Sequence, residues 1–170
     1  SRNGLKKIIL FNGHGGSTNF LQYFCQSQLA LRKDFIVVLF RSGSDPVIDK
    51  EIASLKKATN DGLAGEEETS MMYFIRPDLV DTEAIGLESG ASQGRLDLMP
   101  LGFTGIWWYS RYPNHYAGDA VQPDKRLGEL LVSKDADQLV ALIKYLKSNN
   151  EIERLQNEFY DRAEDPLKKN

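Results

Sequence analysis

The strongest constraint on the fold is a strand–helix–strand pattern in the first 40 residues. Residues 7–11 and 35–40 are short, continuous apolar runs, and the second is rich in β-branched residues. Such runs are typical of strands buried on both faces of a parallel sheet. Between them, apolar positions recur at spacings of three and four residues, as on one face of a helix. The pattern predicts a βαβ unit with a parallel sheet and a right-handed crossover.

The rest of the chain predicts helices separated by irregular segments. We expect helices over residues 49–57, 66–75, 125–147 and 151–163. Residues 81–104 contain many glycines and no clear period, so we expect an irregular segment with one short strand near residues 96–98. Residues 112–118 predict a loop, and residues 164–170 a frayed tail.

Composition limits the class of protein. The chain has 170 residues, of which 41% are apolar, enough for the core of one domain. Its net charge of -3 argues against a nucleic-acid partner, which selects for a basic surface. No apolar run approaches the roughly 20 residues that span a bilayer, so no membrane partner is expected. Cys25 has no second cysteine to pair with, and we therefore expect a cytoplasmic protein.

His14 is the first candidate for chemistry, because it follows the first predicted strand in the glycine-rich turn Asn12-Gly13-His14-Gly15-Gly16. Ligands of open α/β sheets bind beyond the carboxyl ends of strands, and glycines allow a metal or substrate to approach the backbone. A neutral imidazole is a common metal ligand. A loop histidine without function and an anion-binding turn at a helix N-terminus remain open. No P-loop lysine follows the glycines, which argues against a nucleotide phosphate site.

Three successive carboxylates, Glu66, Glu67 and Glu68, begin the predicted helix at residues 66–75. The helix dipole favours negative charge there, which explains them without a function. An apolar face follows Glu68, however, and we expect this residue to point toward the sheet, where an unpaired carboxylate is costly. A metal ion near His14 would supply the cation that a buried Glu68 needs.

Two motifs in order resemble those of one known family. Asn12-Gly13-His14-Gly15-Gly16 resembles the Asn-Gly-His-Gly-Gly-Asn motif of the creatininase family. Ala64-Gly65-Glu66-Glu67-Glu68-Thr69-Ser70 resembles that family's His-Ala-Gly-Glu-x-Glu-Thr-Ser motif. Residues 76–81 are similar to the segment that usually follows, and residues 112–119 to a late glycine-containing active-site loop. The resemblance covers most of residues 7–147.

The resemblance implies a three-layer α/β/α sandwich with a mainly parallel sheet, as a single domain over residues 1–170. It also implies a metal-dependent amidohydrolase, which hydrolyses a cyclic amide or related C–N bond of a small molecule through a metal-bound water. Two divalent ions are expected, and mixed imidazole and carboxylate ligands suit zinc, manganese or iron. Family members are often homo-oligomers, so a second copy of the chain is an expected partner.

The resemblance also suggests roles for individual residues. His14 and Glu68 would bind metal, Glu66 would act in catalysis beside the metals, and Gly15 and Gly16 would lie against the substrate. From its loop, His115 could transfer protons, although a surface histidine is an equal alternative. Trp107 and Trp108 could wall an apolar substrate pocket, or belong to the core or to an oligomer contact.

Three departures from the family pattern bear on activity. Leu63 occupies the position of the second motif's histidine, and leucine cannot transfer a proton. Ser17 stands where the first motif ends in asparagine. The family's other metal ligands come from an N-terminal region that we expect this chain to lack, together with its strand and helix. A non-catalytic creatininase-like protein that binds a small ligand or a partner subunit is therefore the alternative.

Overall fold

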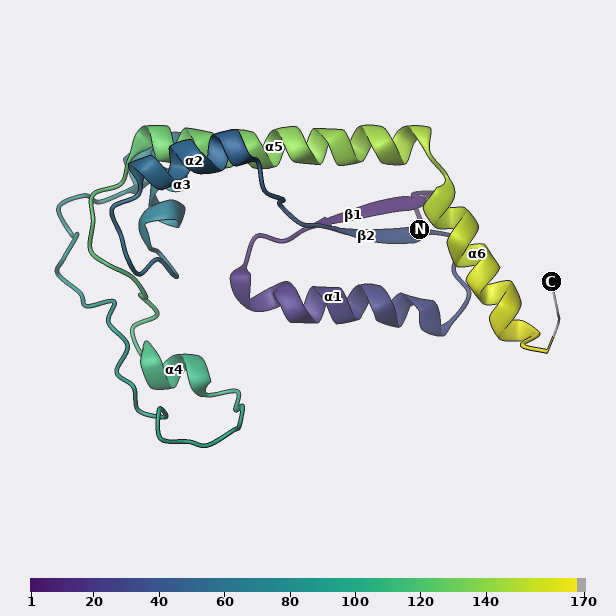
Figure 1. Ribbon diagram of the computed structural model, residues 1–170, viewed down its shortest axis with the longest axis horizontal. Coiled ribbons are helices and arrows are strands. Elements are labelled where there is room, and N and C mark those ends of the chain that lie inside the picture. The colour runs from purple at the N-terminus through teal and green to yellow at the C-terminus, as the bar shows by residue number, and fades with distance from the viewer. Residues whose placement is uncertain (168–170) are drawn as a thin grey trace. The chain divides into compact units, whose positions relative to one another are not determined.

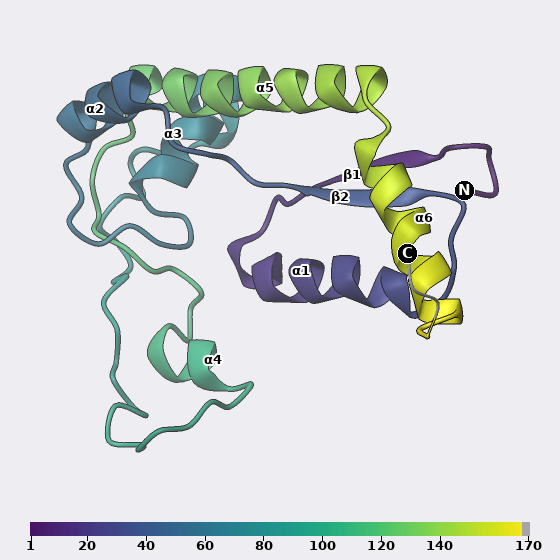
Figure 2. The same ribbon diagram turned by 45° about the vertical axis from the view of Figure 1, so that its right-hand side comes forward.

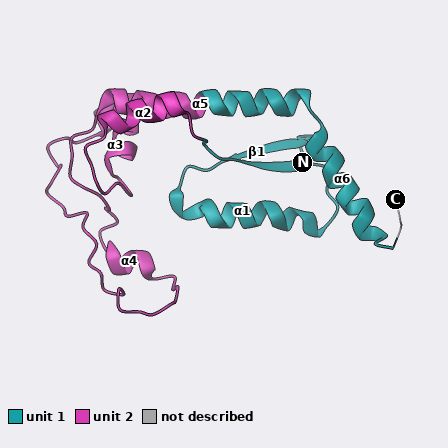
Figure 3. Cartoon of the chain, in the orientation of Figure 1, with its two compact units in different colours: residues 1–43, 137–170 teal, residues 44–136 magenta. Residues whose placement is uncertain are grey.

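The computed structural model describes residues 1–167, which form two compact units (Figure 3). Unit 1 contains Ser1–Gly43 and Asp137–Asn170, and unit 2 contains Ser44–Ala136. Helix α5, Lys125–Ser148, contributes residues to both units. The end of the predicted tail, residues 168–170, lies outside the described residues. The prediction of a single domain stays a prediction.

Unit 1 is built on the predicted βαβ pattern (Figure 1). Strands β1, Lys7–Phe11, and β2, Ile36–Phe40, pair in parallel, with Lys7 opposite Ile36 and Phe11 opposite Phe40. Helix α1, Thr18–Ser27, connects them and is flanked by short 3-10 turns at Gly15–Ser17 and Gln28–Ala30. The predicted parallel pairing is confirmed.

Helices lie on both sides of this strand pair. In Figures 1 and 2, α1 lies on one side and the unit 1 portion of α5 on the other. Helix α6, Glu151–Glu164, also packs on β2, and its Gln156 side chain donates a hydrogen bond to the Phe35 carbonyl at 2.9 Å. The sheet has only two strands among residues 1–167, so the complete three-layer sandwich stays a prediction.

The Lys7 side chain links β1 to the junction between α5 and α6 through hydrogen bonds and an ion pair. Its ammonium group donates hydrogen bonds to the carbonyls of Leu146 and of Asn149, the latter at 2.8 Å. It also forms an ion pair with Glu153 at 2.9 Å. The last carbonyls of a helix have no partners inside the helix and carry partial negative charge. One half-buried cation therefore satisfies the end of α5 and fixes the turn into α6.

Unit 2 contains α2, Pro46–Leu55, α3, Glu66–Ile75, and α4, Trp107–Arg111, with a 3-10 turn at Pro77–Leu79. Helix α2 begins three residues before the predicted start. Its N-terminus is capped by Asp45, whose carboxylate accepts hydrogen bonds from two backbone N–H groups of the first turn, each at 3.1 Å. Proline at the first helical position favours the same start.

The core of unit 2 lies between α2 and α5. It consists of Ile52, Leu127 and Leu130, and Ile48, Leu55 and Leu131 pack against them.

One predicted element is wrong. Residues 96–98 form no strand, because the backbone closes turns there, from the Asp97 N–H to the Gly94 carbonyl and from the Met99 N–H to the Leu96 carbonyl, both at 3.0 Å. The aromatic residues that follow this segment form helix α4.

Within the part of the chain that the structure describes, no helix is both long and apolar enough to cross a membrane.

Helices α3 and α5 approach each other closely at Gly128. A Cβ atom at this position would lie 2.0 Å from the carbonyl oxygen of the fully buried Ser70. The Ser70 hydroxyl also accepts a hydrogen bond from the Asp124 N–H at 3.0 Å, just before α5 begins. Glycine is therefore required for the two helices to pack at this distance.

We expect Gly128→Ala to lower the free energy of unfolding by about 1–3 kcal/mol, because the added methyl group forces the helices apart. Urea denaturation monitored by circular dichroism measures this. Gly105→Ala is the matched control, since nothing lies within 4 Å of the Cβ position at Gly105. Equal stabilities for the two variants would contradict the close approach.

Candidate active site

The first motif forms a compact turn at the carboxyl end of β1 in unit 1. The His14 N–H donates to Oδ1 of Asn12 at 3.1 Å, and the Ser17 N–H donates to the His14 carbonyl at 3.0 Å. A Cβ atom on Gly16 would lie 2.7 Å from Nε2 of His14, so this glycine leaves room for the ring. The imidazole of His14 is exposed beyond the strand end, where a ligand could reach it.

The second motif begins with a tight turn that leads into α3. Ala64 has a φ of 56°, in the left-handed region that few residues other than glycine adopt. Its N–H donates to Oε2 of Glu68 at 2.8 Å, and its carbonyl accepts from the Thr69 hydroxyl at 3.0 Å. Glu68 thus caps the start of α3 and is exposed. The expectation that Glu68 is a buried carboxylate is wrong.

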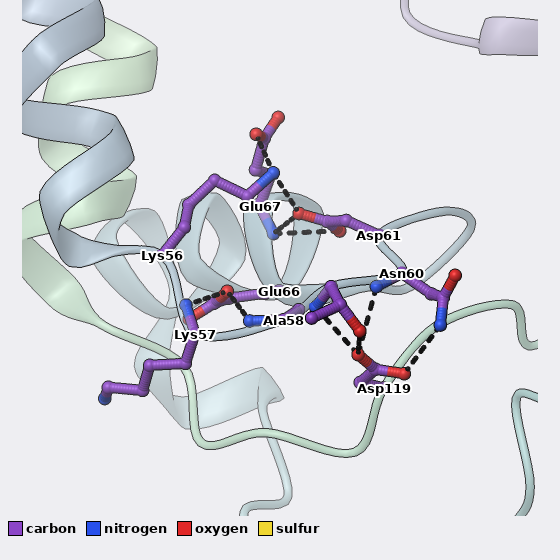
Figure 4. A network of polar contacts seen from close by, with 9 residues as sticks. Lys56, Lys57, Ala58, Asn60, Asp61, Glu66, Glu67 and Asp119 are labelled. Atoms are coloured by element: carbon purple, nitrogen blue, oxygen red, sulfur yellow. Dashed lines mark hydrogen bonds and ion pairs between the residues drawn. The ribbon is translucent and has the colours of Figure 1, made fainter.

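Glu66 is the buried carboxylate of the second motif, with 1% of its surface exposed. Its oxygens accept hydrogen bonds from the backbone N–H groups of Lys57 and Ala58, the shortest to each at 2.8 Å (Figure 4). A buried carboxylate needs such partners, and these two amides satisfy it. Its predicted catalytic role stays a prediction, and these contacts count against it because both oxygens are occupied and closed to solvent.

An ion-pair cluster also stabilises the segment between α2 and α3. The Lys56 ammonium lies 2.9 Å from Asp61 and 2.6 Å from Glu67 (Figure 4). Burial alone would lower the pKa of Lys56, but hydrogen bonds to Glu67 and Asp61 raise it above its usual value. Lys56 therefore stays charged and links the end of α2 to the turn before α3.

Asp119, in the late loop, is a functional candidate that the sequence reasoning missed. Its carboxylate accepts hydrogen bonds from Thr59 N–H and hydroxyl, both at 2.8 Å, and from Asn60 N–H at 3.0 Å and side-chain amide at 3.2 Å (Figure 4). The bonds from the Asn60 backbone and the Thr59 hydroxyl hold the pKa of Asp119 far below its usual range. The signal in the sequence was an acidic residue directly after Gly118 in the family-like loop.

The late loop is joined to the second motif by backbone hydrogen bonds as well. The Asp119 N–H donates to the Asn60 carbonyl at 2.9 Å, and the Ala117 N–H donates to the Leu63 carbonyl at 3.0 Å. A Cβ atom at Gly62 would lie 2.7 Å from the Ala117 carbonyl oxygen, so glycine permits this approach. Two segments that are about 55 residues apart in the chain therefore form one surface of unit 2.

This surface borders a pocket of about 490 Å³. Four polar side chains reach it from the second motif and the late loop, namely Glu68, Thr69, Tyr116 and Asp119, and the carboxylates of Asp81 and Glu88 also line it. Burial raises the pKa of Tyr116, and the charges of Asp119 and Asp61 raise it further, so its hydroxyl stays protonated. The remaining lining is mostly apolar and includes Met72, Leu79, Val80, Ile85 and Val121. A small, largely apolar cavity with a few convergent polar groups is typical of a ligand site.

The other predicted residues lie elsewhere. His115 has a φ of 65° and an exposed ring, and is not among the residues that line this pocket. Trp107 and Trp108 do not line it either; Trp108 borders a second hollow, which also contacts Asp61 and Gly62. Their predicted roles in proton transfer and substrate binding stay predictions.

The two predicted metal ligands, His14 and Glu68, lie in different units of the chain. No group of three or more histidine, cysteine, aspartate and glutamate side chains within residues 1–167 could hold a metal ion. His14 with Gly15 and Gly16 belongs to unit 1, whereas Glu68 belongs to unit 2. Structural zinc sites use four protein ligands and catalytic sites three, so the described residues alone do not fit a complete metal centre. Their pairing at one ion stays a prediction.

The low pKa of Asp119 predicts how stability depends on pH. In the unfolded chain an aspartate titrates near pH 3.9, above its value in the folded protein. Its stabilising contribution is therefore complete above about pH 4 and is lost as the pH falls toward the folded pKa. We expect Asp119→Asn to be less stable than the unaltered protein at pH 7, with a smaller difference at pH 3. Urea denaturation at both pH values tests this, and a difference that grows on acidification would contradict it.

Comparisons with known proteins place the chain in a family. The family model described as "Creatininase: Creatinine amidohydrolase" matches residues 1–143. Among curated proteins, none matches the chain significantly. Similar solved structures include a protein of Bacteroides fragilis NCTC 9343 assigned by its name to creatinine amidohydrolase, with a TM-score of 0.59 and 19% identity over 87% of this chain and 56% of that one.

Two further structures have the same fold. A creatinine amidohydrolase (creatininase) has a TM-score of 0.55 and 22% identity, over 84% of this chain and 56% of that one. A structure named creatininase Mn has a TM-score of 0.56 and 22% identity, over 84% and 57%. The chain thus spans somewhat more than half the length of the solved structures that it resembles. Together with the match over residues 1–143, these findings show that the chain belongs to the creatininase family.

Proposed function

We propose that this chain carries part of the active site of a metal-dependent amidohydrolase, which cleaves a cyclic amide or related C–N bond of a small molecule. The observation that supports this most directly is the pocket beside Glu68. Four of its polar side chains come from the second motif and the late loop, the two segments of unit 2 that resemble the active-site regions of the family. Creatinine is the first substrate to test, because the family model and the similar structures carry its name.

Within this proposal, Glu68 is the carboxylate that acts on the substrate. Amide hydrolysis adds water to the carbonyl carbon, breaks the C–N bond and delivers a proton to the departing nitrogen. Oε2 of Glu68 is held by the Ala64 N–H at 2.8 Å, whereas Oε1 has no hydrogen-bond partner among the described residues. A carboxylate fixed through one oxygen and free at the other can accept and return a proton at the pocket wall.

The proposal includes a divalent metal of the type zinc, manganese or iron, which when bound polarises an amide carbonyl as a Lewis acid. A structure named for manganese shares this fold. His14 is the candidate ligand in unit 1, since its ring is exposed and neutral imidazole binds such metals. The number of ions, a cytoplasmic location and a homo-oligomer belong to the proposal as well.

We expect His14→Ala to weaken manganese binding at least about tenfold, because it removes a direct ligand. Isothermal titration of Mn²⁺ into the complete gene product measures the affinity. The melting temperature in metal-free buffer should change little, since the ring is exposed. His115→Ala is the matched control and should leave the affinity unchanged. Equal affinities for the two variants would remove His14 from the metal site.

We expect the complete gene product to hydrolyse creatinine in the presence of Mn²⁺, and Glu68→Gln to lower kcat about 100-fold through loss of proton transfer. Glu83→Gln serves as the control, because Glu83 is exposed near the pocket but does not line it. A Glu68→Gln enzyme as active as this control would exclude the role proposed for Glu68.

A non-catalytic relative is the second candidate function, and Leu63 is the observation that favours it. Its backbone carbonyl keeps the bond to the Ala117 N–H at 3.0 Å, so the turn forms without the family's histidine. The same assay separates the two functions. An inactive protein that gains turnover on Leu63→His is a non-catalytic relative, whereas turnover by the unaltered protein excludes this function.

A further inference from the structure

The pocket beside Glu68 contains one side-chain hydrogen-bond donor that the rest of unit 2 does not use. Two hydroxyl groups line it, those of Thr69 and Tyr116. The Thr69 hydroxyl donates to the Ala64 carbonyl at 3.0 Å. The Tyr116 hydroxyl, on a partly buried side chain, has no hydrogen-bond partner among residues 1–167. A ligand in the pocket therefore meets Tyr116 as the available side-chain donor.

The other polar side chains of the pocket are acceptors. They are the carboxylates of Glu68, Asp81, Glu88 and Asp119. N–H groups of unit 2 hold each of them in place; Asp81 accepts from the Glu83 N–H at 3.0 Å and Glu88 from the Asn114 amide at 3.0 Å. No lysine, arginine or histidine is among the described residues that line the pocket. An anionic ligand would be repelled there, whereas ligand N–H groups would find acceptors.

The backbone fixes the position of the Tyr116 ring. A Cβ atom at Gly90 would lie 2.8 Å from Cε1 of Tyr116, so the ring lies directly against the backbone of this glycine. The next residues are held as well, because the Ala117 N–H donates to the Leu63 carbonyl at 3.0 Å and the Gly118 N–H to the Gly90 carbonyl at 3.2 Å. A donor that is in place before the ligand arrives needs little reorganisation to bind it.

The surrounding charges keep Tyr116 a donor. Burial and the carboxylates of Asp119 and Asp61 raise its pKa, because a phenolate would add a negative charge beside theirs. Ionised carboxylates can only accept hydrogen bonds, and a protonated phenol can donate one. Donation and acceptance in the pocket are thus divided between Tyr116 and the acidic side chains.

Amide hydrolysis needs a donor of this kind. When water adds to the carbonyl carbon, negative charge develops on the carbonyl oxygen, and a fixed donor stabilises it. Leu63 has no donor group in its side chain, and His115 does not line the pocket. Tyr116 does line it, and its neighbour in the chain, Ala117, is bonded directly to the Leu63 backbone. Tyr116 therefore stands next to the segment that lacks a donor.

We propose that Tyr116 is the substrate-binding donor of this pocket. Its hydroxyl donates a hydrogen bond to the carbonyl oxygen of the amide that is cleaved, and the carboxylates restrict the substrate to amides that carry N–H groups and no negative charge. This assignment rests on the proposed function.

The roles of Tyr116 and Glu68 in the reaction are then distinct. The oxygen of water bonds to the carbonyl carbon, and one proton of that water passes to Oε1 of Glu68. The C–N bond then breaks, and the same proton passes from Glu68 to the departing nitrogen. Tyr116 keeps its own proton throughout and stabilises the negative charge on the carbonyl oxygen between the two steps.

Binding of 2-pyrrolidinone, a small cyclic amide, tests the contact without any turnover. In an NMR titration of the complete gene product without added metal, we expect Tyr116→Phe to weaken binding about 3- to 10-fold, the net contribution of one hydrogen bond. Phenylalanine keeps the ring that lies against Gly90. Tyr112→Phe is the matched control, since Tyr112 belongs to the same loop but lines the second hollow. Equal affinities for the two variants, or no binding at all, would overturn the assignment.

A charged probe of the same ring tests the substrate class. We expect 5-oxoproline, which adds a carboxylate to 2-pyrrolidinone, to bind at least about tenfold more weakly because of repulsion by the acidic side chains. Glu88→Gln should narrow this difference, and Glu83→Gln, outside the lining, should not. Binding of 5-oxoproline as tight as that of 2-pyrrolidinone would contradict the restriction to substrates without negative charge.

Turnover separates the role of Tyr116 from the proposed function itself. With Mn²⁺ and creatinine, we expect Tyr116→Phe to lower kcat of the complete gene product about 100-fold with little change in KM, and Tyr112→Phe to leave both unchanged. Turnover by Tyr116→Phe at the rate of this control would exclude the role of Tyr116 and leave the hydrolase in place. Lactam binding that depends on Tyr116 in a protein without turnover supports the donor and removes only the proposed reaction.

Discussion

The satisfaction of backbone amides by buried or half-buried carboxylates is the constraint on which unit 2 depends. Glu66 holds the amides of Lys57 and Ala58 between α2 and α3, and Asp119 holds those of Thr59 and Asn60. An amide that loses such a partner when buried costs about 1–3 kcal/mol. These bonds fix the turn before α3, and so they fix where Glu68 lies and how the pocket is walled.

Much of the fold follows from patterns within one segment. The apolar runs predicted both strands, and α3 has the predicted bounds, Glu66–Ile75, because its apolar spacing and Pro77 act locally. The prediction of a strand near residues 96–98 is wrong because backbone hydrogen bonds close turns there, one of which begins at Gly94. Sequence periodicity cannot show such a closure, nor the close packing at Gly128, which depends on Ser70 in another helix.

The candidate site shows the same division between local and distant effects. The motifs identified Glu66 and Glu68. The sequence predicted that Glu68 is the buried carboxylate, whereas the structure shows that Glu66 is buried and Glu68 is exposed. The buried positions of α3 are Glu66 and Ser70, four residues apart on one helix face, and Glu68 lies off that face. Asp119 was missed because its partners, Thr59 and Asn60, are about 60 residues away in the chain, and no local pattern links them.

The account rests on Glu66 as the structural carboxylate, which leaves Glu68 free at the pocket wall. Amide hydrogen exchange at Lys57 and Ala58 measures this most directly. In the unaltered protein both amides should exchange slowly, Glu66→Ala should speed exchange at these two positions, and Glu68→Ala should leave them protected. Rapid exchange in the unaltered protein, or protection that survives Glu66→Ala, would contradict the assignment.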